Sequence, residues 1–223
     1  DLGTRMPLAI CWPKQFPAGR TSDDFVSLTD LAPTFLEAAG KDAPDCMTGR
    51  SLLKILRSPK AGRVEPERDC VFAARERHAW CRIDGEGYPI RMIRTQDFLY
   101  IRNDESGRWP AGDYRVVTNE GSYGDVDGSP TKSVMIERKD DYPKLFELAF
   151  GMRPKEELYD CRKDPDQLHN LASDPTYEAT RRALAEKLNA QLGATSDPRE
   201  AAGEMPWDKW PYFGRKNWKI LPE

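Results

Sequence analysis

Two charged segments of this 223-residue chain carry the residue types from which an anion-binding site is made. Residues 75–78 read Arg-Glu-Arg-His and residues 88–91 read Tyr-Pro-Ile-Arg, each at an end of an expected strand. Guanidinium groups present paired donors that fit the oxygens of sulfate or carboxylate, and sites are often built at strand ends and loops. The alternative is a solvated surface with one structural histidine, because arginine and glutamate are mostly exposed. Judged from residue types alone, the alternative leads.

Metal chemistry finds little support in the residue spacing. His78 and Cys81 are spaced like two metal ligands, but no second pair of cysteine or histidine residues lies at a zinc-site separation. Residues 125–128, Asp-Val-Asp-Gly, resemble the start of a calcium loop, yet the terminal glutamate is out of register and Pro130 interrupts the pattern. We therefore expect no metal site in this chain and a turn at residues 125–128.

No nucleophile motif is present. The sequence has neither a Gly-x-Ser-x-Gly elbow nor a phosphate loop, and its two histidines leave little scope for acid–base pairs. Six aromatic residues could stack on sugar faces or pin an irregular tail across the domain, and packing is favoured because aromatic rings bury large areas. These residues are Trp109, Trp207, Trp210, Tyr212, Phe213 and Trp218.

Composition excludes several classes of partner. Hydrophobic residues make up 39% and charged residues 32%, which is typical of a globular protein. A net charge of -3 provides no broad basic field for nucleic acid, and no apolar run approaches the roughly 20 residues of a membrane helix. The five cysteines are irregularly spaced, so a disulfide framework is not expected.

The elements that position these residues follow from local patterns. Residues 6–12 form an apolar run that predicts a strand buried on both faces. Residues 26–40 predict a helix with Asp30 as N-cap and Gly40 as C-terminal stop. Its expected buried face holds Leu31, Phe35 and Leu36.

Further along, strands are expected at residues 69–75, 89–95, 98–102 and 157–160, with a turn at Gln96-Asp97. Residues 104–141 are rich in Gly, Asp and Ser and predict a long loop, which is either functional or mobile.

Residues 157–175 organise the second half of the chain. Asp164-Pro165 predicts a turn, and Asp174 and Pro175 fit the N-cap and first position of a helix that runs to Leu192. Leucines 184, 188 and 192 share one face of that helix with Tyr177, so it should cover the small sheet.

The same stretch carries a family resemblance. Glu-Leu-Tyr-Asp at residues 157–160, a basic pair, Asp-Pro, Asn-Leu-Ala and a second Asp-Pro resemble the C-terminal signature of the sulfatase family. Residues 7–36 and 49–53 are similar to the closing βα unit of the sulfatase catalytic domain. Residues 75–102 and 123–132 resemble the heparan N-sulfatase (sulfamidase) branch.

The resemblance implies an α/β and α+β fold. Residues 1–60 would be the last strand and helix of an alkaline-phosphatase-like α/β domain. Residues 61–223 would be an α+β subdomain, a small antiparallel sheet packed by a C-terminal helix, with a long loop at 103–141 and an aromatic tail at 203–223.

The resemblance also implies a function. A longer parent protein would hydrolyse sulfate esters or N-sulfates of sugars, using a formylglycine made from a Cys-x-Pro-Ser-Arg motif and a calcium ion, neither of which this chain supplies. Glu76, His78 and Arg91 would contact the sulfated saccharide, and residues 123–132 would form a second pocket wall. The chain alone, without its N-terminal catalytic domain, would be inactive, and the parent periplasmic or secreted.

Two alternatives stay open. The first is a non-catalytic carbohydrate-binding or interaction module that reuses the same subdomain. The second is a phosphoryl-transfer enzyme of the alkaline-phosphatase superfamily, which fits residues 157–175 less well.

Overall fold

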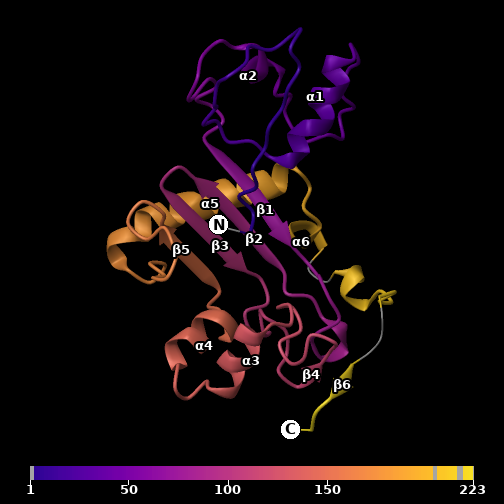
Figure 1. Ribbon diagram of the computed structural model, residues 1–223, viewed down its shortest axis with the longest axis vertical. Helices are drawn as coiled ribbons and strands as arrows, with labels where there is room; N and C mark the ends of the chain where they lie inside the picture. Colours follow the sequence, from indigo (N-terminus) through magenta and orange to yellow (C-terminus); the bar gives the residue numbers. More distant parts are fainter. Residues whose placement is uncertain (1–2, 203–204, 215–217, 223) are drawn as a thin grey trace. The chain divides into compact units, whose positions relative to one another are not determined.

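The computed structural model describes residues 3–202, 205–214 and 218–222. The chain divides into two compact units (Figure 1). The first is Asp1–Ala73 with Ile93–Phe98, and the second is Ala74–Met92 with Leu99–Glu223. The charged segments at residues 75–78 and 88–91 both lie in the second unit.

The first unit holds short helices whose ends are set by local signals. The Asp30 carboxylate accepts the Ser27 amide at 3.1 Å while the Ser27 hydroxyl accepts the Thr29 amide, which forms a capping box. Gly40 has φ +68°, a left-handed conformation that glycine adopts readily, and it ends the helix as predicted. The elements are the 3-10 helix η1 (Leu28–Asp30), α1 (Leu31–Ala38) and α2 (Leu53–Arg57).

A buried arginine ties these helices together. The Arg68 side chain is 2% exposed and pairs with Asp30 at 2.8 Å and Glu65 at 2.7 Å. It also donates to the carbonyls of Arg50 and Ser51 at 2.9 and 2.8 Å. Asp30 therefore stands at the N-cap position of α1, as predicted, but its carboxylate serves Arg68 and η1 rather than α1.

Two predictions in this unit are wrong. Residues 6–12 form no strand and are largely exposed, with Met6 at 63%. An apolar run becomes a strand only where a neighbour satisfies its backbone, and no described segment pairs with this one. Phe35 is 62% exposed, because α1 turns Pro33 and Thr34 inward instead.

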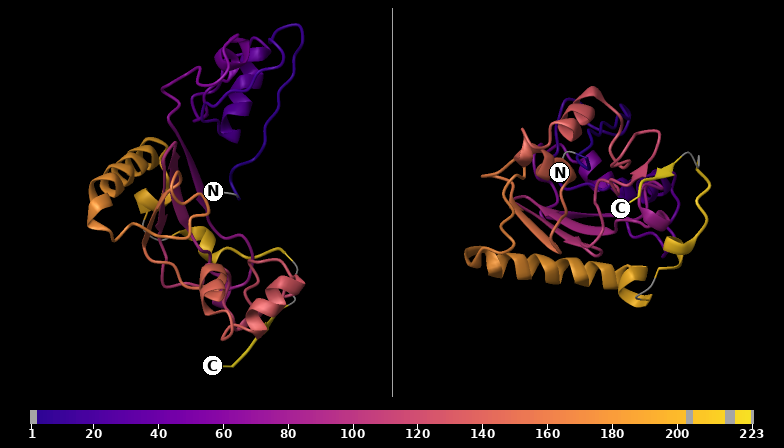
Figure 2. Two further views of the ribbon diagram at one scale, coloured as in Figure 1. Left: turned by 60° about the vertical axis from the view of Figure 1, so that its left-hand side comes forward. Right: turned by 90° about the horizontal axis from the view of Figure 1, so that it is seen from below.

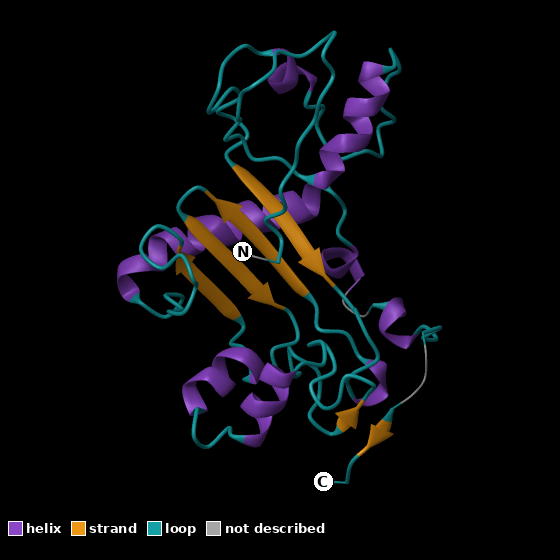
Figure 3. Cartoon of the chain, viewed as in Figure 1, coloured by secondary structure: helices purple, strands orange, loops and turns teal. Residues whose placement is uncertain are grey.

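Four strands form a sheet in the order β1-β2-β3-β5, and neighbouring arrows run in opposite directions (Figure 3). The predicted turn between β2 and β3 is closed by the Thr95 hydroxyl, which accepts the Phe98 amide at 3.1 Å. The small antiparallel sheet expected from the sequence is confirmed. The strands are β1 (Cys70–Arg75), β2 (Ile90–Thr95), β3 (Phe98–Asn103) and β5 (Glu156–Asp160).

A long helix lies along one face of this sheet (Figure 2). The Asp174 carboxylate accepts the Thr176 amide at 2.8 Å and starts the 3-10 turn η3 (Pro175–Tyr177), which leads into α5 (Glu178–Ala194). Leucines 184, 188 and 192 are all buried, so the predicted amphipathic helix is confirmed. Within the described ranges no helix is long and apolar enough to cross a bilayer.

The segment expected to be a long loop is partly helical. Pro130 occupies the first turn of α3 and Ser129 caps it by accepting the Lys132 amide at 3.1 Å, so the proline begins a helix. Ala111, Tyr123 and Phe150 form the core under this segment. The elements here and beyond are η2 (Ile83–Gly85), β4 (Val116–Val117), α3 (Pro130–Glu137), α4 (Pro143–Phe150), α6 (Pro198–Ala202), η4 (Pro206–Lys209) and β6 (Lys219–Ile220), with β4 and β6 paired antiparallel.

Candidate functional site

The two charged segments meet, as expected, at one end of the sheet. β1 and β2 are neighbours, β1 ends at Arg75 and β2 begins at Ile90. The Arg91 guanidinium bonds the Glu76 carboxylate at 2.6 Å across the pair. Two of the three predicted substrate residues are therefore in direct contact, and the third belongs to a different group of side chains.

The hydrogen-bond donors of the Arg91 guanidinium are paired with acceptors within the chain. Its side chain is 3% exposed, and it holds both oxygens of Asp197 at 2.9 and 3.1 Å in addition to Glu76. Its remaining nitrogen donates to the Ile90 carbonyl at 3.0 Å. The Nε of Arg199 also donates to both carboxylate oxygens of Glu76, at 2.8 and 2.9 Å. We call Glu76, Arg91, Asp197 and Arg199 the Arg91 cluster.

The geometry gives the Arg91 cluster a structural role. It joins the end of β1 and the start of β2 to the segment after α5, which contributes Asp197 and Arg199. All three guanidinium nitrogens of Arg91 already have protein acceptors, so binding sulfate there would require an internal ion pair to break. Substrate contact by Glu76 and Arg91 stays a prediction.

His78 is built differently. Its side chain is 67% exposed, yet its Nδ1 lies 2.8 Å from Oδ1 of Asp125, whose side chain is 2% exposed. The other oxygen of Asp125 accepts a hydrogen bond from Arg82 at 2.6 Å and faces Arg75 at 3.6 Å. We call His78, Arg82 and Asp125 the His78 cluster. One edge of the imidazole is thus anchored and the rest faces solvent.

The charge state of Asp125 follows from its neighbours. Burial alone would raise the pKa of this carboxyl, but the charge and hydrogen bond of Arg82 outweigh it, and the pKa is lowered. Arg82 is itself fixed by the carbonyls of Trp109 and Pro110, both at 2.7 Å. Asp125 is therefore an anion at neutral pH, and it selects the tautomer of His78 that carries a proton on Nδ1. Nε2 is left as the exposed nitrogen.

A buried lysine shapes the loop that delivers Asp125. The Lys132 ammonium donates to the carbonyls of Glu120, Tyr123 and Val126 at 2.7, 3.0 and 2.6 Å. Tyr123 takes φ +54°, which turns the chain just before Asp125. The turn itself lies at residues 123–126, where the Val126 amide donates to the Tyr123 carbonyl at 3.1 Å, so it overlaps the turn predicted at residues 125–128 only in part.

Asp125 and Arg82 were missed as functional partners from the sequence. The sequence places Asp125 in a possible calcium loop and, by resemblance, in a second pocket wall, but neither prediction pairs it with His78, 47 residues away, or with Arg82, 43 residues away. No local pattern joins residues at that separation. A buried, paired Arg82 four residues after His78 also leaves no periodic signal.

The two predicted metal-like residues, His78 and Cys81, do not form part of a metal site among the described residues. No group of three or more His, Cys, Asp or Glu side chains is arranged to hold a metal ion in that part of the chain. Cys81 is buried, and burial raises the pKa of its thiol to about 12, so it stays protonated at neutral pH.

The predicted aromatic residues differ in their surroundings. Trp109 packs against the core of Ala111, Tyr123 and Phe150. Trp218 stacks on Trp80 with ring centroids 3.8 Å apart, while Trp210 and Phe213 are 58% and 94% exposed. Tyr212 lies under the guanidinium of Arg77, and the Trp207 side chain is outside the described residues.

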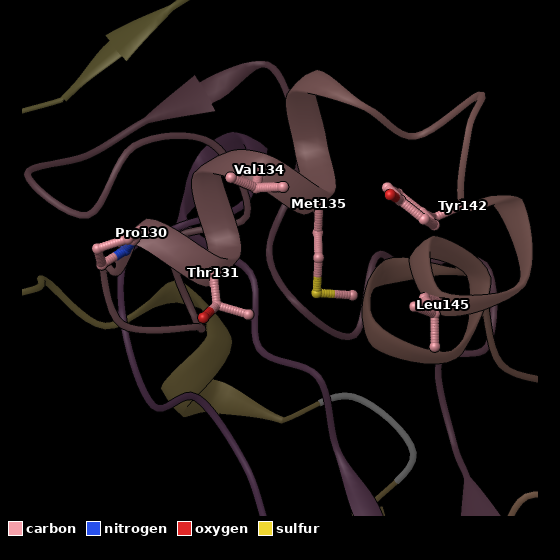
Figure 4. A pocket seen from close by; sticks show the side chains of 6 residues that line it. All are labelled: Pro130, Thr131, Val134, Met135, Tyr142 and Leu145. Atoms are coloured by element: carbon pink, nitrogen blue, oxygen red, sulfur yellow. The ribbon is translucent and has the colours of Figure 1, made fainter.

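The larger of the two hollows described here lies away from these charged groups. It has a volume of about 390 Å³ between α3 and α4 (Figure 4). Its walls are mainly apolar and come from both helices. The lining residues are Pro130, Thr131, Val134, Met135, Tyr142 and Leu145.

The stretch at residues 157–175 proves to be a structural clamp. Glu157 accepts hydrogen bonds from the Asn103 amide at 2.7 Å and the Tyr159 hydroxyl at 2.5 Å. Asn170 accepts the Leu158 amide at 2.9 Å, and Asp164 closes the turn by accepting two backbone amides. These side chains fix β5 to Asn103 of β3 and to the loop at residues 164–170, and they take no part in the His78 cluster.

Comparisons with known proteins agree with this architecture. A family profile described as N-sulphoglucosamine sulphohydrolase, C-terminal, matches residues 1–72. A Formosa agariphila protein named ulvan-active sulfatase is 32% identical over 197 residues, covering 88% of this chain and 34% of that protein. The Homo sapiens N-sulphoglucosamine sulphohydrolase is 27% identical over 214 residues, covering 88% of this chain and 38% of that enzyme.

The chain is similar to the C-terminal portion of sulfatases. A solved structure, described as a complex with its substrate D-glucosamine-2-N,6-O-disulfate, superimposes with a TM-score of 0.57 at 24% identity. The match covers 88% of this chain and 30% of that one, and it shows a shared fold. The chain spans about a third of the length of the curated relatives it matches.

Proposed function

We propose that the longer protein to which this chain belongs hydrolyses sulfate esters or N-sulfates on sugars. The observation that carries the proposal is the match, over 88% of the chain, to an ulvan-active sulfatase and to N-sulphoglucosamine sulphohydrolase. The fold shared with a protein described with a sulfated glucosamine adds support. Both O-sulfated and N-sulfated sugars fall within the proposed substrate class.

His78 is the residue we propose for substrate contact. Its Nδ1 is anchored on Asp125 while two thirds of its side chain is exposed, which leaves Nε2 free to meet a ligand. A neutral imidazole accepts a hydrogen bond from a sugar hydroxyl at Nε2, and a protonated one donates to a sulfate oxygen. Within this proposal the Arg91 cluster holds the strand ends that present His78.

The cofactors implied by the family resemblance do not fit the described residues. Calcium would need several convergent carboxylates, and no such group is found in the described part of the chain. Cys81 is a buried neutral thiol, and none of the five cysteines begins a Cys-x-Pro-Ser-Arg motif. We propose that calcium and formylglycine belong to the remainder of the longer protein, and that this chain supplies substrate-binding wall.

The test compares the full protein with the 223-residue chain on a sulfated glucosamine. We expect the full protein to release sulfate, measured by ion chromatography, and the isolated chain to release none. If the isolated chain released sulfate and a chelator abolished that release, the proposal that catalysis belongs to the remainder of the longer protein would be wrong. If the full protein bound the sugar without releasing sulfate, the result would favour the alternative function, a non-catalytic carbohydrate-binding module.

A further inference from the structure

We propose that a small cavity beside the His78 cluster binds one unsulfated sugar ring of the substrate, an inference that rests on the proposed function. The cavity has a volume of about 160 Å³. Three segments form it: residues 79–80 directly after His78, residues 118–124 directly before Asp125, and the C-terminal segment. Its chemistry comes from Trp80, Thr118, Asn119, Glu120, Tyr212 and Trp218.

One side of the cavity is aromatic and firmly built. The indoles of Trp80 and Trp218 stack at 3.8 Å with an interplanar angle of 18°. Gly85 makes room for this wall, because a Cβ there would come within 2.2 Å of Trp80 Nε1. The C-terminal segment is held by the β4–β6 pair and by the Leu221 amide, which donates to the Arg115 carbonyl at 2.8 Å. Flat apolar rings suit the C–H face of a pyranose.

The other side of the cavity offers hydrogen bonds. No hydrogen bond joins the Asn119 side-chain amide to the described part of the chain, so its donor and its acceptor are both available to a ligand. The Glu120 carboxylate is oriented by the Gly128 amide, which donates to it at 2.6 Å. An amide, a carboxylate and an aromatic wall in one hollow match alternating hydroxyls above an apolar ring face.

Charge decides which ring enters. Glu120 places a negative charge at the cavity, which repels sulfate. The cations around the cavity have partners within the chain: Arg82 pairs with Asp125, and Lys132 directs its ammonium at three backbone carbonyls. Arg77, whose guanidinium lies over the Tyr212 ring, donates to the carbonyl of Trp210 at 3.0 Å. At about 160 Å³ the hollow is smaller than the roughly 300 Å³ at which drug-sized pockets begin, so it admits one ring. The sulfated neighbour would then lie toward His78.

The test titrates the 223-residue chain with N-acetylglucosamine disaccharide and follows the Trp80 indole and Asn119 amide signals by ¹⁵N NMR. We expect both signals to shift, and inorganic sulfate at equal concentration to leave the titration unchanged. Asn119→Ala should weaken binding about tenfold, as loss of one hydrogen-bonding pair predicts. Phe213→Ala is the matched control, because this exposed ring on the same segment does not line the cavity.

A second variant reports on charge without truncating the wall. Glu120→Gln should let a sulfated glucosamine bind more tightly while the neutral disaccharide binds as before. Competition by sulfate in the wild type, or unchanged binding in Asn119→Ala, would overturn the subsite. If the chain fails to bind the disaccharide while the full protein still releases sulfate, the subsite falls and the proposed function stands.

Discussion

The Arg91 cluster and the His78 cluster both include a residue just after β1, but they differ in how far the protein satisfies and buries their charged side chains. Glu76 and His78 are two positions apart, and each meets a charged partner contributed by a distant segment. In the Arg91 cluster every guanidinium nitrogen of Arg91 is satisfied within the protein and the side chain is 3% exposed. In the His78 cluster the anchor is buried and the imidazole is exposed.

This contrast suggests a criterion for distinguishing a charged side chain that stabilises the fold from one that can bind a ligand. A charged side chain whose hydrogen-bonding capacity is filled by the protein holds the fold together, and a ligand must compete with its partners. A side chain with one polar atom fixed and another free is oriented before any ligand arrives. The sequence motif Arg-Glu-Arg-His gives both kinds of residue the same appearance.

The largest expected effect breaks the Arg91 cluster. Arg91→Ala leaves Glu76 and Asp197 without their common partner and should lower the free energy of unfolding by about 3–5 kcal/mol, measured by urea denaturation. Arg182→Ala is the control, since that exposed residue pairs weakly at 3.9 Å with Glu186. A variant that unfolds like the wild type but loses saccharide binding would make Arg91 a substrate residue after all.

The next effect tests the support of the His78 cluster. Lys132→Met removes the ammonium that donates to three carbonyls. It should lower the free energy of unfolding by about 2 kcal/mol, because those acceptors stay buried without a donor. Hydrogen exchange of the amides at residues 120–126 should accelerate. Lys144→Met, at an exposed position on α4, should change neither quantity. Unchanged exchange in Lys132→Met would show that the loop is held by other contacts.

A functional effect separates the clusters. His78→Gln in the full protein should reduce kcat/KM for a sulfated glucosamine about tenfold, the size of one hydrogen bond to a charged group. Thermal unfolding should be nearly unchanged, because the imidazole is 67% exposed. The exposed His169→Gln provides the matched control. Equal activity of the two variants would remove His78 from the site.

Acid stability probes Asp125. Its folded pKa lies below the unfolded value of about 3.9, so its charge contributes stability that is present above that pH and lost as pH falls through the folded pKa. Asp125→Asn should therefore lose less stability than the wild type between about pH 4 and pH 2, measured by denaturation at each pH. Parallel curves for the two proteins would place the acid sensitivity at other carboxylates.

The last prediction needs no substitution and concerns the tautomer of His78 in the wild-type chain. Long-range ¹H–¹⁵N NMR at neutral pH should show His78 carrying its proton on Nδ1, because Asp125 accepts from that atom at 2.8 Å. His169 is the internal reference, since its Nδ1 is 3.6 Å from Asp164. The same tautomer distribution at both histidines would mean that Asp125 does not orient His78.

Local chemistry predicted much of the fold correctly. The four strands, the turn at Gln96-Asp97 and the α5 start at Asp174-Pro175 depend on neighbours in sequence, so patterns of side chains reveal them. The failures have different causes. Residues 6–12 need a distant partner to become a strand, whereas Pro130 begins α3 next to the Ser129 cap, a local signal that was interpreted as an interruption of a calcium loop.

Local patterns in the sequence predict most of the strands and the helix α5, and they identify β1 and β2 as the strands whose ends carry charge, because hydrophobic period, caps and turns act over a few residues. The partners of the charged side chains depend on the tertiary structure. Asp197 pairs with Arg91 across 106 residues, and Asp125 anchors one nitrogen of His78 from 47 residues away, which makes His78 the candidate contact that we propose. Burial and pairing between distant segments set the function of a charged side chain, and a linear pattern does not contain them.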